Sequence, residues 1–176
     1  EGTSLGNAGV ISPWSCVPQS MPGQWKHIPR WTLKPDGPVA LRWQYLPFLL
    51  PWIARFLASA SRSRINGIAD ALFALNDHAP DLYRTLVRGT GGENLIRKSN
   101  YIHVFRDPRH ADPSSLQWRM RLARGVPLKF VTGNEVREIE PALSGEYQAA
   151  VLIQSQARCI NPGRLGKVLA QAAREQ

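Results

Sequence analysis

The sequence has little of what a metal site or a membrane span requires. Its only cysteines, Cys16 and Cys159, lie far apart without a Cys-x-x-Cys pair or histidine companions, so a zinc site is not expected. A disulfide between them is left open. The longest apolar run, Tyr45 to Ser59, is too short to span a bilayer, and Pro51 and Arg55 interrupt it.

Acidic residues are also scarce: 13 stand against 22 Lys and Arg, which gives a net charge of +9. Such a charge balance can indicate binding to nucleic acid, to an anionic membrane surface or to acidic ligands. The basic residues are scattered, however, and their densest cluster is Arg119, Arg121 and Arg124. This pattern favours a solvated basic surface or a fragment that lacks an acidic remainder. Nucleic-acid binding has no module signature here, and no nucleic-acid partner is expected.

The composition is that of a globular protein. A chain of 176 residues, 43% of them hydrophobic, can form one domain with its own core. Between residues 12 and 44, proline is frequent and regular structure is not expected. The tryptophans of this stretch are predicted to pack on an existing surface; they are Trp14, Trp25, Trp31 and Trp43.

Helical periodicity is clearest in the middle of the chain. Pro51 is expected to open a short helix with an apolar face that includes Trp52 and Phe56. A long amphipathic pattern then runs from about residue 63 to 88, where Pro80 predicts either a kink or two helices nearly in line. Its apolar positions are Ile65, Ile68, Leu72, Leu75, Ala79, Leu82 and Leu86.

Short strands and further helices follow. Strands are predicted at 101–106, 128–131 and 149–153. Asp112-Pro113 is expected to start a helix, Thr132 to Glu135 has capping-box form, and Asn161-Pro162 is expected to cap a last helix. The predicted fold class is therefore α+β, with a mostly antiparallel sheet and flanking helices.

Residues alone give only weak signals of a site. The glycine-rich stretch 89–94 lacks the Gly-Lys-Ser/Thr of a phosphate loop, and the four histidines do not stand at metal spacing, so no metal is expected. On the predicted strand, Tyr101, His103 and Phe105 share one face. That face could be a substrate-pocket wall or an ordinary sheet face. No catalytic residue is identified.

The opening stretch, Thr3-Ser4-Leu5-Gly6-Asn7-Ala8-Gly9-Val10-Ile11-Ser12-Pro13, resembles a segment of the D-amino-acid oxidase-like flavoproteins, most closely their bacterial D-amino-acid dehydrogenase branch. In that family the segment passes beside the FAD. Further stretches resemble the family in the same order: 37–38, 45–56, 101–105, Glu140-Pro141 and 160–165. The resemblance covers nearly the whole chain.

The resemblance implies a set of cofactor-contacting residues, and their chemistry agrees with it. A flavin pyrophosphate needs close backbone approach, which small residues allow, and hydroxyl and amide groups can bond to it. The implied FAD-binding residues are Thr3, Ser4, Gly6, Asn7, Ala8, Gly9 and Val10. Tyr101 and His103 are the implied substrate-binding residues, and a carboxylate-binding arginine is expected but not identified.

The family's Gly-x-Gly-x-x-Gly is absent from this sequence, which therefore resembles a fragment with an incomplete FAD domain. The implied division is a FAD-domain remnant at 1–13, a substrate-binding or cap domain at 14–158, and a helix at 159–176 that returns to the FAD domain.

The implied parent is an FAD-dependent oxidoreductase that deaminates D-amino acids or related amines and passes electrons to a membrane quinone or another acceptor. It would be cytoplasmic, with possible peripheral contact at the inner face of the bacterial membrane. The isolated chain is expected to be inactive and not to retain FAD. The alternative is a basic membrane-surface module that uses the apolar helix 45–59.

Overall fold

The computed structural model describes residues 4–23, 26 and 42–175. Contacts between Cα atoms divide the chain into two compact units. The first comprises residues 1–15 and 73–176, and the second comprises residues 16–72. Each unit is described separately below.

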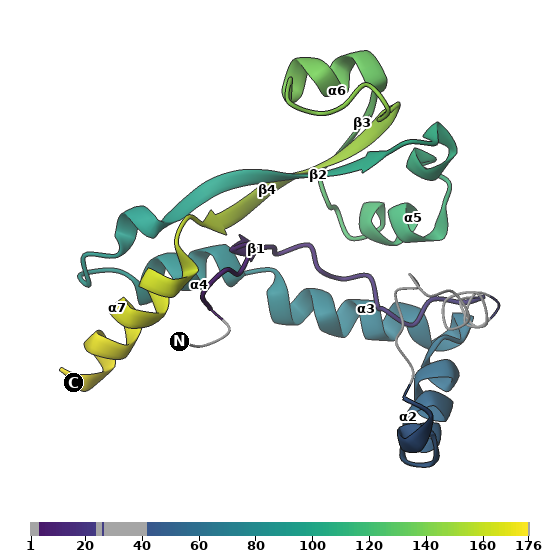
Figure 1. The fold of residues 1–176 in the computed structure, drawn as a ribbon, viewed down its shortest axis with the longest axis horizontal. Helices are drawn as coiled ribbons and strands as arrows, with labels where there is room; N and C mark the ends of the chain where they lie inside the picture. The colour runs from purple at the N-terminus through teal and green to yellow at the C-terminus, as the bar shows by residue number, and fades with distance from the viewer. Residues whose placement is uncertain (1–3, 24–25, 27–41, 176) are drawn as a thin grey trace. The chain divides into compact units, whose positions relative to one another are not determined.

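The first unit is built on an antiparallel sheet in which one strand pairs with all the others (Figure 1). The strands are β1 (Val10–Ile11), β2 (Ile96–Phe105), β3 (Leu128–Thr132) and β4 (Ala149–Cys159). β2 runs along one edge of β4, whereas β1 and β3 share the opposite edge. The α+β class with an antiparallel sheet is thereby confirmed.

Strands β2 and β4 are about twice as long as their sequences predicted. Their extra residues are largely polar, but the continuous pairing from Ile96 with Cys159 to Phe105 with Ala149 supplies the backbone hydrogen bonds. The pairing shifts register between Ser99 and Tyr101. Opposite this irregularity Ser155 has a φ of 57°, a left-handed conformation that is uncommon for a non-glycine residue.

One hydrophobic cluster lies at the end of the sheet where β1, β4 and β2 meet. Helices α4 (Ala79–Leu86) and α7 (Pro162–Arg174) contribute to it. Asn161 caps α7, as predicted, because its Oδ1 accepts a hydrogen bond from the Arg164 amide at 2.9 Å. The buried members are Ile11, Val87, Leu95, Ile96, Ala157, Cys159 and Leu165.

Helix α6 (Gly133–Ile139) lies at the opposite end of the sheet from α7 (Figure 1). Its capping box is confirmed: the Glu135 carboxylate accepts a hydrogen bond from the Thr132 amide at 2.8 Å. A second cluster there contains the buried residues Val131, Val136, Ala150 and Leu152, with Ile102 and Val104 packed against it.

The other face of β2 is covered by α5 (Leu116–Leu122). The expected start of this helix at Asp112-Pro113 is wrong, because the Asp112 carboxylate binds Ser114 in a turn and Ser115 is the N-cap. The fully buried Trp118 makes edge-to-face contacts with His103 at 5.5 Å and Phe105 at 6.3 Å. The predicted aromatic face of β2 is therefore present, and α5 partly covers it at His103 and Phe105.

The amphipathic pattern at 63–88 forms two helices, α3 (Arg62–Asn76) and α4, with Pro80 in the first turn of α4. The predicted inward positions are wrong for Leu75, Leu82 and Leu86, which are 78%, 58% and 57% exposed. The break at residues 77–78 changes the helical phase, so that α4 buries Pro80 and half-buries Tyr83 instead.

In the second unit, α2 (Leu46–Ser59) begins five residues before the predicted start. Pro47 stands in its first turn, and Pro51 lies inside the helix rather than opening it. Trp25 and Trp31 of this unit lie outside the described residues.

Candidate functional site

The opening segment forms a tight, exposed turn that is fixed to the end of β4. The Asn7 side-chain oxygen accepts a hydrogen bond from the Gly9 amide at 2.8 Å, and the Gly9 carbonyl accepts one from the Cys159 amide at 2.7 Å. β1 then pairs with β4 through Val10 and Ile11. The segment is therefore held at its Gly9 end, while residues 4–8 remain exposed.

The two glycines of this segment serve different purposes. Gly9 has a φ of 69°, and a Cβ there would lie 2.1 Å from the Cys159 carbonyl oxygen, so the packing of this chain itself requires glycine. Gly6 has a φ of 77°, but a Cβ there would meet no atom within 4 Å. No described neighbour therefore requires the small size of Gly6.

This exposed backbone fits the close approach of a phosphate-bearing nucleotide. Residues 4–8 are exposed, and the amides of Gly6 and Ala8 donate no hydrogen bond within the described residues. An adjoining cavity of about 290 Å³ lies between this segment and α7. Of the FAD-binding residues implied by the sequence, Ser4, Asn7, Gly9 and Val10 line this cavity. Thr3 lies outside the described residues.

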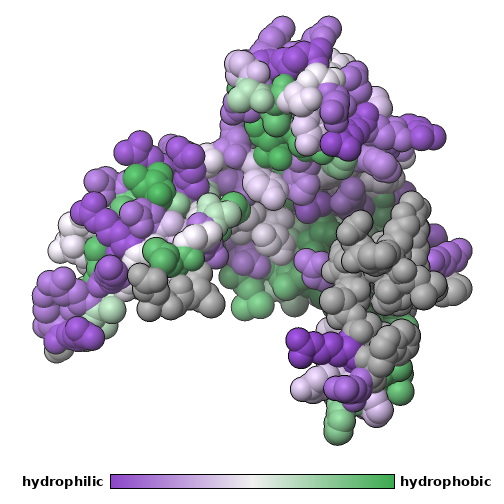
Figure 2. Space-filling model, viewed as in Figure 1, coloured by the Kyte–Doolittle hydropathy of each residue, from purple (hydrophilic) through white to green (hydrophobic). Residues whose placement is uncertain are grey.

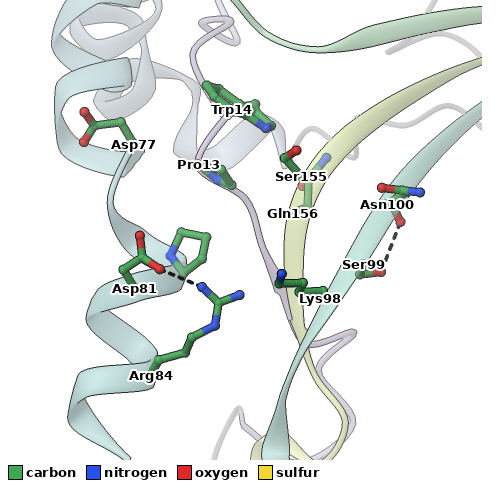
Figure 3. Close-up of a pocket in the computed structure, with 11 residues that line it drawn as sticks. Pro13, Trp14, Asp77, Asp81, Arg84, Lys98, Ser99, Asn100, Ser155 and Gln156 are labelled. Carbon is green, nitrogen blue, oxygen red and sulfur yellow. Dashed lines mark hydrogen bonds and ion pairs between the residues drawn. The ribbon is translucent and has the colours of Figure 1, made fainter.

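A larger polar cavity, of about 590 Å³, lies between α4 and the strands β2 and β4 (Figure 3). Arg84 reaches into it from α4 and Lys98 from β2. Arg84 is bound to Asp81 at 2.6 Å, whereas Lys98 makes no ion pair within the described part of the chain. The remaining lining residues are Pro13, Trp14, Asp77, Pro80, Ser99, Asn100, Ser155 and Gln156.

One wall of the polar cavity contains a buried acceptor without a partner. Gln156 is 3% exposed, and its amide nitrogen donates to the Ile153 carbonyl at 3.3 Å. Its Oε1 is buried and accepts no hydrogen bond within the described residues. Such a group carries an uncompensated desolvation cost.

Trp14 closes another wall of the cavity and is held firmly. Its indole Nε1 donates to the Gln154 carbonyl at 2.9 Å, and its ring stacks on Phe73 with 5.8 Å between centroids. The prediction that tryptophans of this stretch pack on an existing surface is confirmed for Trp14.

Tyr101 and His103, the substrate-binding residues implied by the resemblance, lie side by side on the aromatic face of β2. Their rings meet edge to face at 4.8 Å. Tyr101 is 43% exposed, whereas His103 is partly covered by Trp118 of α5. Neither lines the polar cavity or the cavity beside α7.

The surroundings of His103 favour its neutral form. Burial lowers the pKa of His103 below its usual 6.5, and the positive charge of Arg121 lowers it further. Arg121 itself lies over the Trp118 ring, with its guanidinium carbon 4.9 Å from the ring centroid. A neutral imidazole at this place can donate or accept a hydrogen bond, depending on its tautomer.

No pattern in the sequence predicted the polar cavity. Its residues come from four separate stretches of chain, and neither Arg84 nor Lys98 belongs to a motif. Only the pairing of β2 with β4 and the phase of α4 bring them together, and both depend on long-range contacts.

The arrangement can bind and orient a small polar molecule. No cluster of three or more potential metal ligands occurs among residues 4–23, 26 and 42–175. Within the same ranges, no helix combines the length and apolar character needed to cross a bilayer.

Comparison with known proteins assigns this chain to a family. The family model described as "FAD dependent oxidoreductase" (DAO) matches residues 1–176. A "D-amino-acid oxidase" of Bradyrhizobium diazoefficiens is 36% identical over 174 residues, which is 98% of this chain and 41% of that protein. A "D-amino acid dehydrogenase 2" of Mesorhizobium japonicum is 26% identical over 82% of this chain and 35% of that protein.

The fold is also found in a solved flavoenzyme. Glycine oxidase from Geobacillus kaustophilus matches 99% of this chain and 35% of its own chain, with a TM-score of 0.55 and 20% identity. The present chain spans about two fifths of the length of the D-amino-acid oxidase it matches. The family model matches the whole of this chain, and the D-amino-acid oxidase is 36% identical to it. Together these findings show that the chain belongs to the DAO family of FAD-dependent oxidoreductases.

Proposed function

We propose that the chain is part of an FAD-dependent enzyme that oxidatively deaminates D-amino acids or related amines. Family membership and the 36% identity to a D-amino-acid oxidase support this reaction class. The observation that carries the proposal is the exposed, small-residue turn at residues 4–8, whose backbone is open to a ligand although its Gly9 end is fixed.

FAD, when bound, supplies the acceptor for the hydride that leaves the substrate α-carbon. The amine nitrogen also loses a proton, which gives an imine. Water then adds to the imine and releases the keto acid and ammonia. The two electrons pass on to a membrane quinone or another acceptor.

The role proposed for the opening segment is to hold the flavin nucleotide. Ser4 offers a hydroxyl, and the amides of Gly6 and Ala8, which donate no hydrogen bond within the described residues, offer donors suited to phosphate oxygens. The Asn7 side-chain oxygen accepts a hydrogen bond from the Gly9 amide, so the side-chain NH₂ is the part of this amide available to a ligand. Gly9 and Val10 would contribute mainly by fixing the segment to β4. Thr3 is retained as a proposed contact from the resemblance.

Tyr101 and His103 are proposed to face the amino-acid substrate. Tyr101 has the exposed hydroxyl-bearing side chain that this role needs, and His103 orients it through their ring contact. The division into a FAD-domain remnant at 1–13, a substrate-binding domain at 14–158 and a returning helix at 159–176 is proposed for the whole enzyme. A peripheral position at the inner face of the cytoplasmic membrane is proposed with it.

The reaction is tested with the full-length flavoprotein. D-amino acids, glycine and N-methylglycine are added anaerobically, and the flavin absorbance is followed while ammonia is measured. D-amino acids are expected to bleach the flavin and release ammonia, whereas their L-enantiomers are not. Failure of every D-amino acid and amine to bleach the flavin would contradict the proposal. An oxygen electrode and a soluble quinone then distinguish oxidase from dehydrogenase activity.

The nucleotide-binding role of the segment is tested by Ala8→Leu, which places a bulky side chain on the exposed turn. We expect FAD content after desalting to fall at least about tenfold, because the backbone could no longer approach the nucleotide. Ala142→Leu, at another exposed alanine beyond α6, is the matched control and should leave FAD content unchanged. Equal FAD content in Ala8→Leu and the unmodified protein would overturn this assignment.

A further inference from the structure

Helix α2 is apolar on nearly all sides and buries none of its residues. Ten of its 14 side chains are aliphatic, aromatic or alanine, and Arg55 is its only charged residue. Phe48, Leu50 and Trp52 are 82%, 54% and 58% exposed. A surface helix of this composition normally packs its apolar side against something.

The apolar surface of α2 is ordered by local contacts. Trp52 stacks on Phe56 with 5.0 Å between ring centroids. At the end of the helix, the Ser59 hydroxyl donates to the Phe56 carbonyl at 2.7 Å, and its oxygen lies 2.8 Å from that of the buried Ser20 hydroxyl. The aromatic pair is therefore presented on a helix whose end is fixed.

The sequence on either side of α2 carries positive charge without acidic residues. No Asp or Glu occurs from residue 37 to residue 69, a stretch that contains Arg42, Arg55, Arg62 and Arg64. The second unit as a whole has seven Lys and Arg against two Asp, a net charge of +5. Figure 2 shows hydrophobic and strongly hydrophilic surface adjoining over α2. This charge is complementary to anionic headgroups.

The length of α2 suits a position in the plane of a membrane surface. Fourteen residues span about 21 Å at 1.5 Å per residue. The hydrocarbon core is about 30 Å thick, so a helix of this length cannot cross it. Tyr45, which is 59% exposed at the start of the helix, and Trp52 are the residue types that favour the membrane–water boundary.

We propose that α2 docks on an anionic lipid surface, with Phe48, Leu50 and Trp52 at the boundary of headgroups and acyl chains. The flanking arginines contact the phosphate groups. The inference concerns the lipid contact alone and does not depend on the flavin chemistry. It specifies the element and the lipid class for the peripheral membrane position proposed above.

The experiment uses the FAD-loaded full-length protein and sedimented vesicles. One set is phosphatidylcholine mixed with phosphatidylglycerol, and the other is phosphatidylcholine alone. We expect sedimentation with the anionic vesicles, and weaker sedimentation with the neutral ones or at high salt. Trp52→Ser combined with Phe56→Ser should reduce anionic-vesicle binding by roughly tenfold or more, because two large apolar side chains are lost.

Leu82→Ser is the matched control, since Leu82 on α4 is 58% exposed, the same fraction as Trp52. It should bind vesicles like the unmodified protein. Arg62→Gln combined with Arg64→Gln should weaken binding to anionic vesicles only. FAD content and turnover, measured on the same samples, report separately on the flavin proposal and on folding.

Three results would overturn the inference. The first is absence of binding to either kind of vesicle, which indicates that other parts of the protein cover α2. The second is an equal loss of binding in Leu82→Ser. The third is a dimer, seen by light scattering, that the Trp52 and Phe56 substitutions dissociate, because α2 would then be covered by a second copy.

Discussion

At the scale of single residues, Gly9 is a position where the fold leaves no room for a side chain. Gly9→Ala would hold an alanine at a positive φ and would place its Cβ 2.1 Å from the Cys159 carbonyl oxygen. We expect this substitution to cost about 1–3 kcal/mol more than Gly6→Ala, which has a similar φ but no atom within 4 Å. Urea unfolding of the two variants measures the difference, and equal midpoints would show that the contact with Cys159 does not matter.

His103 predicts a pH dependence of stability. Its pKa is lower in the folded protein than the usual 6.5, because of burial and then Arg121, so the unfolded chain binds the proton more readily. Neutral His103 therefore contributes its full stabilisation above pH 6.5. This stabilisation is lost as the pH falls through 6.5 toward the pKa of His103 in the folded protein.

Thermal unfolding between about pH 7 and pH 5 measures the effect of His103. The groups that face it are Tyr101 on its own strand, and Trp118 and Arg121 on α5. His103→Phe keeps an aromatic ring and should flatten the slope in this range. An unchanged slope would assign the pH dependence to other groups.

Residue-level predictions from the sequence held where the interaction is local. The capping box of Thr132 with Glu135 and the Asn161 cap depend on neighbours three positions apart, and both are present. The shared face of Tyr101 and His103 followed from the two-residue period of a strand. Its cover, Trp118, could not be foreseen, because α5 reaches β2 through tertiary packing.

At the scale of elements, α4 shows how a short break changes which face of a helix is buried. Val87, directly after α4, is 1% exposed, whereas Leu82 is 58% exposed. Val87→Ala should therefore lower the free energy of unfolding by about 2 kcal/mol, and Leu82→Ala by less than about 0.5 kcal/mol. Chemical denaturation measures the loss in free energy of unfolding for both variants. A larger loss for Leu82→Ala would support the continuous helical pattern that the sequence predicted.

The three predicted strands were placed correctly, but β1 was not predicted, and β2 and β4 are longer than predicted for a physical reason. The first half of β2, Ile96 to Asn100, contains four polar residues in sequence and has no apolar alternation. It is a strand because β4 pairs with it. The polar cavity depends on the same pairing, so the sequence that failed to predict the strand also failed to predict the cavity.

At the scale of the whole molecule, the chain alone is not expected to hold its cofactor. The proposed nucleotide contacts come from one exposed turn, and the chain spans 41% of the D-amino-acid oxidase it matches. After incubation with FAD and desalting, the isolated chain should show little flavin absorbance and no turnover. Stoichiometric retention of FAD would contradict this expectation and would indicate a complete site within these 176 residues.

The family could be recognised from the sequence because several short stretches occur in a fixed order, beginning with residues 3–13. The division of the chain into compact units could not, because residues 1–15 join residues 73–176 through the pairing of β1 with β4. That pairing joins residues far apart in the chain and leaves no local pattern.

The central position of β4 has a consequence for synthesis. Every strand of the sheet pairs with β4, and all of them precede it in the chain. Val10 cannot pair with Arg158 until Arg158 has been synthesised, 148 residues later. The first strands therefore leave the ribosome without a pairing partner, and the sheet closes late, through contacts of high sequence separation that fold slowly. During translation, the edges of β1, β2 and β3 are exposed to other chains and to chaperones until β4 emerges.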